Sequence, residues 1–316
     1  MMTAAKSALL AALAGLLSPT GEPAQPEPVA GTGGVRRFHH VHMNVVDPDR
    51  SAAFLAGIFP QTRVTILGGL TALRTEEVFI LFTKVDAPAP FSWDTAIWHI
   101  GWNSPDVAGD YRRLSARGVR FSRVPAPGST SADLVTPDQV DVELALGLPT
   151  RGGSTPTAFN HVHLMSETPL CAADWYVRVL RLRRGHDTGR LAGDCRVPSA
   201  PRTEPGGLIR GPAGRVFAGD IMVVIYPYQK LEALSATPMK APAPMASGKG
   251  HVLDHIAFEV DDTRAEAKRL RALGVRIIEP PRVRGISGRR SMMIEGPDAI
   301  RIELVETADP RGASPD

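Results

Sequence analysis

Cysteine and an excess of either charge are both scarce in this 316-residue sequence. Only Cys171 and Cys195 occur, which excludes a disulfide scaffold and a cysteine-rich zinc site. Lys and Arg number 36 against 33 Asp and Glu, so the formal net charge is only +3. So small an excess provides no basic face for a polyanion, and we expect no nucleic-acid partner.

Long hydrophobic runs are also absent. The apolar run at residues 8–17 is too short to cross a bilayer, which takes about 20 residues, so we expect no stable membrane span. Lys6 precedes this run, and a stretch rich in Pro and Gly follows it to Gly34, an order typical of a signal peptide and a disordered linker. We therefore place residues 1–34 outside the fold and expect a periplasmic or secreted protein. If the run is an ordinary Ala- and Leu-rich helix instead, the protein is cytoplasmic.

The rest of the composition is that of a soluble protein with a substantial core. Hydrophobic residues make up 43% and charged residues 22% of the chain. These fractions exclude a collagen, a coiled coil and a mostly disordered chain. The length is about twice that of a typical domain, so two domains are expected.

An internal repeat organises the chain after residue 35. Four blocks recur in the same order: residues 38–43 and 159–164, 98–102 and 254–258, 112–120 and 268–276, and 137–144 and 297–304. The repeat predicts a tandem duplication, with one domain at 36–147 and the other at 158–306. Residues 183–216 and 229–250 have no counterpart in the first half, and are interpreted as surface insertions or as a lid over a pocket.

Each half divides again into two modules with the order strand, helix and several strands. A strand at 38–46 leads through Asp47-Pro48 to a short apolar helix over 51–59. A strand at 97–103 leads through a cap at Ser104-Pro105 to a helix that Gly118 ends. The pattern predicts an α+β fold of tandem βαβββ modules, two per domain.

The histidines follow the alternation of these strands. Side chains at i and i+2 share one face of a strand, so His40 and His42 oppose the aliphatic residues between and beside them. The same alternation places His161 and His163 together on a polar face. His39 has the opposite parity, and His186 lies in an insertion, so neither is expected to be a ligand.

Later strands place further polar groups on the corresponding faces. His99 and His255 occupy matching repeat positions, as do Glu143 and Glu303. A buried face with two histidines and a glutamate is costly unless something pairs those groups. Two imidazoles and one carboxylate suit a divalent metal, Fe(II) above Mn(II), Zn(II), Co(II) or Ni(II). The alternative is that each histidine is a hydrogen-bonded strand residue and each glutamate is simply on the surface.

The sequence resembles the vicinal oxygen chelate superfamily, the glyoxalase, bleomycin-resistance and extradiol-dioxygenase group. The segments that carry the resemblance are HHVHMNVVDPDRSAAF, NHVHLMSETPLCAADWY, DHIAFEVDDTRAEAKRLRALGV and EGPDAIRIELVE, which together extend over most of 38–306. The resemblance implies modules paired within each half into a cupped, incompletely closed half-barrel of eight strands. Its metal positions fall on His40, His99 and Glu143 in the first half, and on His161, His255 and Glu303 in the second.

Departures from the family pattern reduce the number of subfamilies that the sequence resembles. A fourth ligand of the glyoxalase I type would be a glutamate within 78–85 or 221–228, and neither stretch has a carboxylate. Three ligands per site are more similar to extradiol dioxygenases or to fosfomycin-modifying members. The extradiol pattern also expects a tyrosine where Asp133 and Met293 stand, and a further acid-base histidine that this sequence lacks.

The expected chemistry is bidentate binding of a small substrate with vicinal oxygens. His42 and His163 are the candidates for a general base, or alternatively for residues that orient a ligand. Tyr226 and His251 are weaker candidates for substrate contacts near the mouth of the site.

The sequence therefore predicts a divalent-metal-dependent enzyme, monomeric or homodimeric, with an extradiol-type dioxygenase as one expected activity. The alternatives are a glyoxalase-like lyase or isomerase and a non-catalytic small-molecule binder similar to bleomycin-resistance proteins. A further possibility is that one half is catalytic, the second being favoured, while the other serves as a scaffold.

Overall fold

The computed structural model describes residues 33–76, 78–90, 94–146, 158–187, 212–228, 244–283 and 288–307. Residues from Gly33 onward form one compact unit. The signal-like segment, apart from its last two residues, and most of both predicted insertions lie outside the described residues. The domain boundaries at 36–147 and 158–306 therefore stay a prediction.

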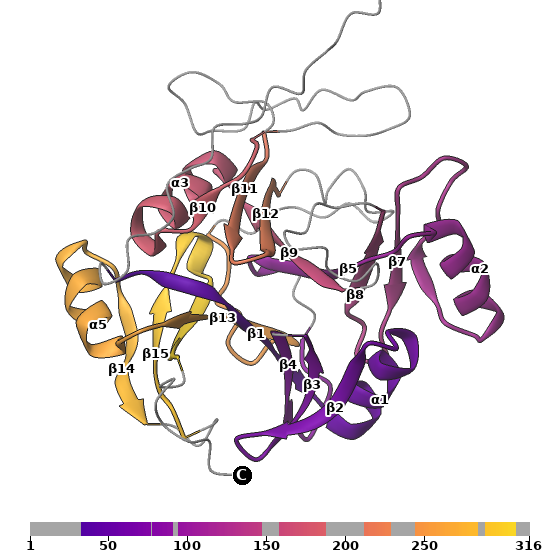
Figure 1. The fold of residues 1–316 in the computed structure, drawn as a ribbon, viewed down its shortest axis with the longest axis horizontal. Helices are drawn as coiled ribbons and strands as arrows, with labels where there is room; N and C mark the ends of the chain where they lie inside the picture. Colours follow the sequence, from indigo (N-terminus) through magenta and orange to yellow (C-terminus); the bar gives the residue numbers. More distant parts are fainter. Residues whose placement is uncertain are drawn as a thin grey trace, which may run out of the picture. The chain divides into compact units, whose positions relative to one another are not determined.

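Two mixed sheets of eight strands each make up the unit (Figure 1). The first, here named the β1 sheet, has the order β14-β15-β16-β13-β1-β4-β3-β2. Its strands are β1 (Val35–Val45), β2 (Thr62–Leu67), β3 (Leu70–Thr75), β4 (Val78–Lys84), β13 (Leu253–Val260), β14 (Ile277–Val283), β15 (Arg290–Glu295) and β16 (Arg301–Glu306).

The second sheet, here named the β9 sheet, has the order β10-β11-β12-β9-β5-β8-β7-β6. Its strands are β5 (Ile97–Asn103), β6 (Phe121–Arg123), β7 (Ser131–Val135), β8 (Asp141–Ala145), β9 (Phe159–Ser166), β10 (Arg183–Arg184), β11 (Gly214–Ala218) and β12 (Ile221–Pro227). The predicted α+β fold of βαβββ modules in two unclosed half-barrels is confirmed.

The pairing of the modules differs from the prediction. Each sheet joins one module from each half, because β1 pairs with β13 and β5 pairs with β9, both antiparallel. The expectation that modules pair within each half is wrong. All four first strands present an apolar face and an open edge of the same kind, so the local pattern is equally compatible with either partner.

In the described part of the chain, α-helices cover the outer faces of the sheets (Figure 1). They are α1 (Pro48–Ile58), α2 (Val107–Ala116), α3 (Pro169–Leu180) and α5 (Thr263–Ala272). The Asp47 carboxylate caps α1 by accepting a hydrogen bond from the Arg50 amide. The cap of α2 is Asp106, not Ser104-Pro105, because the Asp106 carboxylate accepts from the Gly109 amide at 2.8 Å. Among the described residues, no helix is long and apolar enough to cross a membrane.

The core lies between the sheets and these helices. Val41 and Met43 on β1 are fully buried in it, as are Ile256 and Phe258 on β13. The other face of each sheet therefore carries the polar residues of these strands. Alternation along an extended chain decides which side chains share that face.

Two aspartates tie the modules of each half together. Asp138, in the turn before β8, accepts a hydrogen bond from the Ser51 hydroxyl on α1 at 2.6 Å. Asp298, at the repeat-equivalent position before β16, accepts from the Glu167 amide beside α3 at 3.3 Å. In each half, the turn of the later module is therefore hydrogen-bonded to the start of the helix in the earlier module, although the two modules belong to different sheets.

Candidate metal centres

On the polar face of each sheet, one residue from every strand pairs with a residue of the next strand, and together these residues form a row across the sheet, here named the register row. In the β1 sheet the row is Arg63, Arg74, Phe79, His40, Ala257, Glu303, Met293 and Glu279. In the β9 sheet it is Arg183, Phe217, Met222, His161, Gly101, Glu143, Asp133 and Arg123. The two rows match position by position, so the duplication places a histidine and a glutamate at the middle of each sheet.

The first centre, in the β1 sheet, consists of His40, His42, His255 and Glu303. The Nε2 atoms of His40 and His255 are 3.4 Å apart, and each is 3.4 Å from Glu303 Oε2. His42 stacks on the His255 ring at 4.6 Å between centroids, and its Nε2 is 2.7 Å from the Thr83 hydroxyl oxygen. All four side chains are buried.

The outward ring nitrogens of this centre have partners of their own. The Asp254 carboxylate lies 2.7 Å from His255 Nδ1 and accepts a hydrogen bond from its N–H. His39 Nδ1 lies 2.6 Å from His40 Nδ1, so one of the two rings donates to the other. When the Nδ1–H of His255 donates to Asp254 and the Nδ1–H of His40 donates to His39, each of the two ligand rings presents an Nε2 lone pair to the centre.

The position of His39 differs from the prediction. It faces the centre, not the core, with its ring 5.7 Å from that of Phe79. The reason is a register shift between Phe38 and His40 against β13, a bulge that places consecutive residues of β1 on one face.

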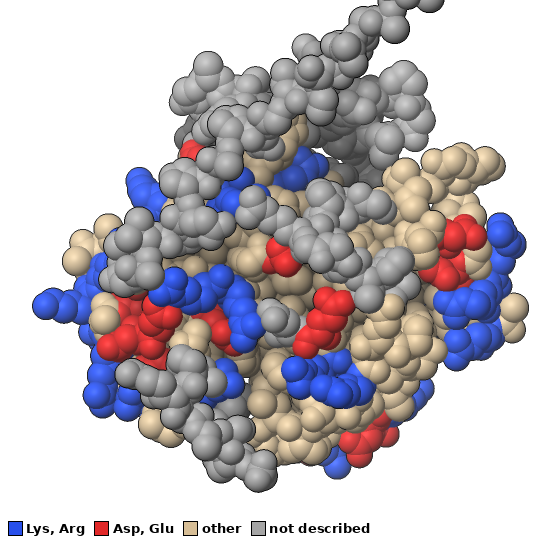
Figure 2. Space-filling view, in the orientation of Figure 1, with Lys and Arg blue, Asp and Glu red and all other residues tan. Residues whose placement is uncertain are grey.

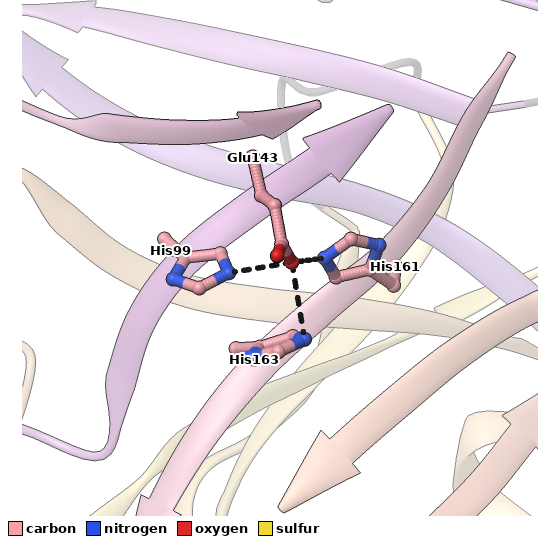
Figure 3. A group of neighbouring side chains, drawn as sticks. All are labelled: His99, Glu143, His161 and His163. Carbon is pink, nitrogen blue, oxygen red and sulfur yellow. Dashed lines mark hydrogen bonds and ion pairs between the residues drawn. The ribbon is translucent and has the colours of Figure 1, made fainter. Parts of the chain in front are cut away.

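The second centre, in the β9 sheet, consists of His99, Glu143, His161 and His163 (Figure 3). Glu143 Oε2 lies 3.0 Å from Nε2 of His161, 3.4 Å from that of His99 and 3.6 Å from that of His163. Figure 3 shows the three rings, from β5 and β9, converging on this one carboxylate from β8. The rings of His99 and His163 stack at 4.2 Å, as those of His255 and His42 do in the first centre.

The surroundings of the second centre are different in chemistry. The Asn160 side-chain oxygen, in the place of His39, accepts a hydrogen bond from His161 Nδ1. Arg123 donates to Glu143 Oε1 at 2.8 Å and to both carboxylate oxygens of Asp133 at 2.7 Å. Gly101 is required beneath the His161 ring, because a Cβ there would lie 2.0 Å from a ring carbon.

Burial and pairing shift the acidities at the first centre in opposite directions. Burial lowers the pKa of His42 to about 3 and that of His39 to about 4, and it holds the pKa of His40 well below its usual range. Burial also opposes protonation of His255, but its hydrogen bonds to Asp254 and Glu303 outweigh this and raise its pKa.

At the second centre the carboxylate stays ionised. Burial alone would raise the pKa of Glu143, yet its contacts with the His161 and His99 rings hold it well below its usual range. Burial lowers the pKa of His161, so this ring is neutral near pH 7. A neutral imidazole beside an ionised carboxylate is the protonation pattern of a metal ligand set.

The structure brings together all six sequence-predicted ligands, but not in the predicted groups. His40, from the first half, meets His255 and Glu303 from the second. His161, from the second half, meets His99 and Glu143 from the first. The grouping by halves is wrong because the sheets join modules across the repeat boundary, and no half contains a complete centre.

The other predicted site residues lie around these centres or away from them. The ring of Tyr226 packs edge-on against His163 at 4.9 Å, and burial raises its pKa. His251 pairs with Asp94 at 3.2 Å, and its backbone oxygen accepts from Asn44. His186 is exposed and belongs to neither centre.

Several residues of the centres escape sequence reasoning. Asp254 and Asn160 each directly precede a ligand histidine, and that adjacency is the one signal that could have identified them. Arg123 lies 20 residues from Glu143 along the chain, and only the pairing of β6, β7 and β8 brings it near.

The donor sets suit a divalent metal ion. Ligand atoms about 2.1 Å from one ion lie roughly 3.0 to 3.4 Å apart at octahedral or tetrahedral angles. The donor atoms of His40, His255 and Glu303 are 3.4 Å apart, and Glu143 Oε2 lies 3.0 to 3.6 Å from the three Nε2 atoms around it. Each set combines imidazole nitrogens with a carboxylate oxygen, so both sites have the geometry and the chemistry to hold an ion.

Comparison with known proteins bears on the fold and the family. No curated protein sequence matches the chain. Glyoxalase I from Zea mays superposes with a TM-score of 0.61 at 16% identity, over 85% of this chain and 92% of that chain. A candidate dioxygenase from Bacillus subtilis subsp. subtilis str. 168 superposes with a TM-score of 0.56 at 18% identity, over 88% and 87%. At these identities the likeness shows a common fold.

The sequence match to a family lies in the second half of the chain. Residues 158–304 match the family model of the Glyoxalase/Bleomycin resistance protein/Dioxygenase superfamily. The first half repeats the same four sequence blocks and completes the same two sheets. Residues 158–304 therefore belong to the glyoxalase/bleomycin resistance protein/dioxygenase superfamily, and the whole chain has the glyoxalase-like fold, with two eight-stranded sheets built from four modules.

Proposed function

We propose that the protein is a divalent-metal-dependent enzyme acting on a small substrate with vicinal oxygens, with one ion at each centre. The observation that carries this is the convergence of two strand histidines and one glutamate at the same register position of both sheets. Groups of this kind are costly to bury without a partner, and the distances between their donor atoms match a single ion.

The ligand roles follow from the distances. His40, His255 and Glu303 would hold one ion, and His99, His161 and Glu143 the other. When bound, the ion supplies positive charge that polarises and orients the substrate oxygens.

His42 and His163 stack against a ligand ring in their respective centres, where a bound substrate would meet them. Burial lowers the pKa of His42 to about 3, which keeps this imidazole neutral near pH 7. A neutral ring suits hydrogen bonding to the substrate, whereas so low a pKa makes it a weak proton acceptor.

Among reaction classes, we favour an extradiol-type dioxygenase with Fe(II). Two histidines and one carboxylate leave open positions on an ion, an arrangement typical of non-haem Fe(II) oxygen chemistry. In β4 and β12 the residues facing the centres include Thr83 and Tyr226, and no carboxylate is available as a fourth ligand. A glyoxalase-like lyase or isomerase is the second candidate, favoured by the fold shared with glyoxalase I from Zea mays.

The decisive experiment is elemental analysis of anaerobically purified protein. We expect close to two ions per chain, and loss of one in each of the variants Glu143→Gln and Glu303→Gln. Asp138→Asn, at a half-buried carboxylate outside both centres, is the matched control and should retain both ions. Iron supports the dioxygenase, a redox-inactive metal supports the lyase or isomerase, and no metal would leave the small-molecule binder as the function.

We also propose that the protein is exported. Cys171 on α3 is disulfide-bonded, and disulfides persist in oxidising compartments outside the cytoplasm. Together with the signal-like segment, this favours the periplasm or the medium. Mass spectrometry of the secreted chain should then find an N-terminus after the apolar run at residues 8–17 and before Gly34. An intact Met1 in the cytoplasmic fraction would contradict export.

A further inference from the structure

The register row through the first centre ends in two arginines. Arg63 on β2 and Arg74 on β3 are directly opposite each other, and Arg74 is opposite Phe79, which pairs with His40. Residues opposite each other in adjacent strands share a face of the sheet, so both arginines lie on the face of the centre. Figure 2 shows Lys and Arg side chains gathered over the area where Figure 1 draws β2 to β4.

Among the described residues, the two arginines have no carboxylate partner of the kind that other arginines of this sheet have. Like charges directly opposite each other destabilise a strand pair. Arg282 and Arg290 of the same sheet each pair with a glutamate, at 2.7 and 3.5 Å. Within the described ranges, no carboxylate lies at ion-pair distance from Arg63 or Arg74; Arg74 donates only to the Glu76 backbone oxygen at 3.1 Å.

The spacing between the arginines and the centre suits a small molecule. Adjacent strands lie about 4.8 Å apart, so Arg74 is about 10 Å from His40 across the sheet. Phe79 occupies the strand between them, half-buried, with the Arg74 guanidinium 5.9 Å from its ring centroid. The row thus offers metal ligands, then a flat apolar surface, then two guanidinium groups.

The β9 sheet has a different arrangement at the matching positions. Phe217 replaces the second arginine, and the guanidinium of Arg183 lies over its ring at 4.1 Å. Only one cation remains at this end, and it stacks on an aromatic face. The two centres therefore differ in the positive charge that they present to a bound ligand.

We propose that the first centre takes an anionic substrate, with vicinal oxygens at one end and a carboxylate or similar oxyanion at the other. The chelating end lies at His40, His255 and Glu303, the body lies over Phe79, and the anion lies between Arg63 and Arg74. Guanidinium groups bind carboxylates through paired hydrogen bonds. This inference rests on the proposed function, because the chelating end requires the ion.

The test compares two probes with the same catechol end and different charge. These are 3-(3,4-dihydroxyphenyl)propanoate and its methyl ester, titrated calorimetrically into Zn(II)-loaded protein carrying Glu143→Gln, which removes the second centre. We expect the acid to bind about 10-fold more tightly than the ester, since one charge-assisted contact contributes about 1.4 kcal/mol or more. Arg74→Gln should reduce the ratio to below about 3-fold and leave the affinity for the ester unchanged.

Each outcome bears on one claim. Arg183→Gln is the matched control in the other sheet and should leave the ratio unchanged. Equal affinities for acid and ester, or a ratio that Arg74→Gln does not alter, would overturn the anionic subsite while leaving the metal site in place. Failure of both probes to bind Zn(II)-loaded protein would overturn the proposed function instead. If the Glu143→Gln protein does not fold, the unmodified protein serves, and the preference for the acid should fall as salt is raised.

Discussion

The two centres have the same donors in the same register but different surroundings. At the first, Asp254 supports His255, while apolar Met293 lies opposite Glu303. At the second, Arg123 donates a hydrogen bond to Glu143, so the guanidinium would compete with a bound ion for the negative charge of this carboxylate. Sheet register has kept the donors of the two halves equivalent, whereas the electrostatic surroundings have diverged.

This difference has a consequence for metal affinity. An anionic partner on the outer nitrogen makes a histidine a stronger ligand, and a cation on a carboxylate makes it a weaker one. We therefore expect the first centre to bind a divalent ion more tightly than the second. Four experiments test how the two centres and their modules differ.

Gly101→Ala should have the largest effect, and only at the second centre. The new Cβ would meet the His161 ring at 2.0 Å and displace this ligand. The first centre already has Ala257 at the matching position, opposite His40. Chelator competition should show metal affinity falling about 100-fold or more at the second centre. Ala257→Gly is the control and should cost only about 1 kcal/mol of unfolding free energy; equal losses at both centres would refute this account of Gly101.

Asp254→Asn should weaken the first centre alone. The substitution removes the charge that His255 Nδ1 faces, and changes of this kind typically cost about 10- to 100-fold in metal affinity. Asp298→Asn is the control, because Asp298 is a repeat-equivalent of Asp138 away from both centres. An unchanged affinity in Asp254→Asn, measured by the same competition, would mean that the outer hydrogen bond does not tune the site.

The metal-free protein should lose stability as the pH falls from about 6.5 towards 4. Burial lowers the pKa values of His39, His40 and His42 at the first centre and of His161 at the second, so the unfolded chain takes up protons first. Each such group contributes a slope of at most about 1.4 kcal/mol per pH unit. The raised pKa of His255 acts in the opposite direction, because its stabilisation is complete below about 6.5 and is lost as the pH rises through its folded value.

Urea unfolding at pH 7, 6 and 5 in the presence of a chelator measures this slope. His42→Gln removes one buried imidazole and should flatten it, whereas His186→Gln, at an exposed position, should not. A slope that is the same in both variants would show that the first centre is not the source of the acid sensitivity.

The smallest effect is expected between the modules. Ser51→Ala removes the hydroxyl that Asp138 accepts from, at a cost of about 1 kcal/mol in thermal or urea unfolding. Asp138→Asn keeps an acceptor oxygen and should cost less. The corresponding contact of Asp298 uses the Glu167 backbone amide, so no side-chain replacement at residue 167 should remove it.

Much of the fold could be predicted because its signals are local. The strand predicted at 97–103 is β5 over Ile97–Asn103, and its alternation places His99 on the polar face. The bulge at His39 could not be predicted, since one extra residue in a strand depends on the register of its partner. The cap at Asp106 was missed for a simpler reason: Ser104 and Asp106 are both good N-cap residues, and the hydrogen bond to Gly109 decides between them.

The sequence by itself determined the donors and the faces that carry them. Side-chain direction repeats every two residues in an extended strand, so neighbours alone settle that His40 and His42 share a face. Which donors meet depends on the tertiary structure, because β1 lies beside β13 and β9 beside β5. The first pairing brings together His40 and His255, which are 215 positions apart in the sequence. It depends on whole strand edges and on the turns at Asp138 and Asp298, and no local pattern contains that information.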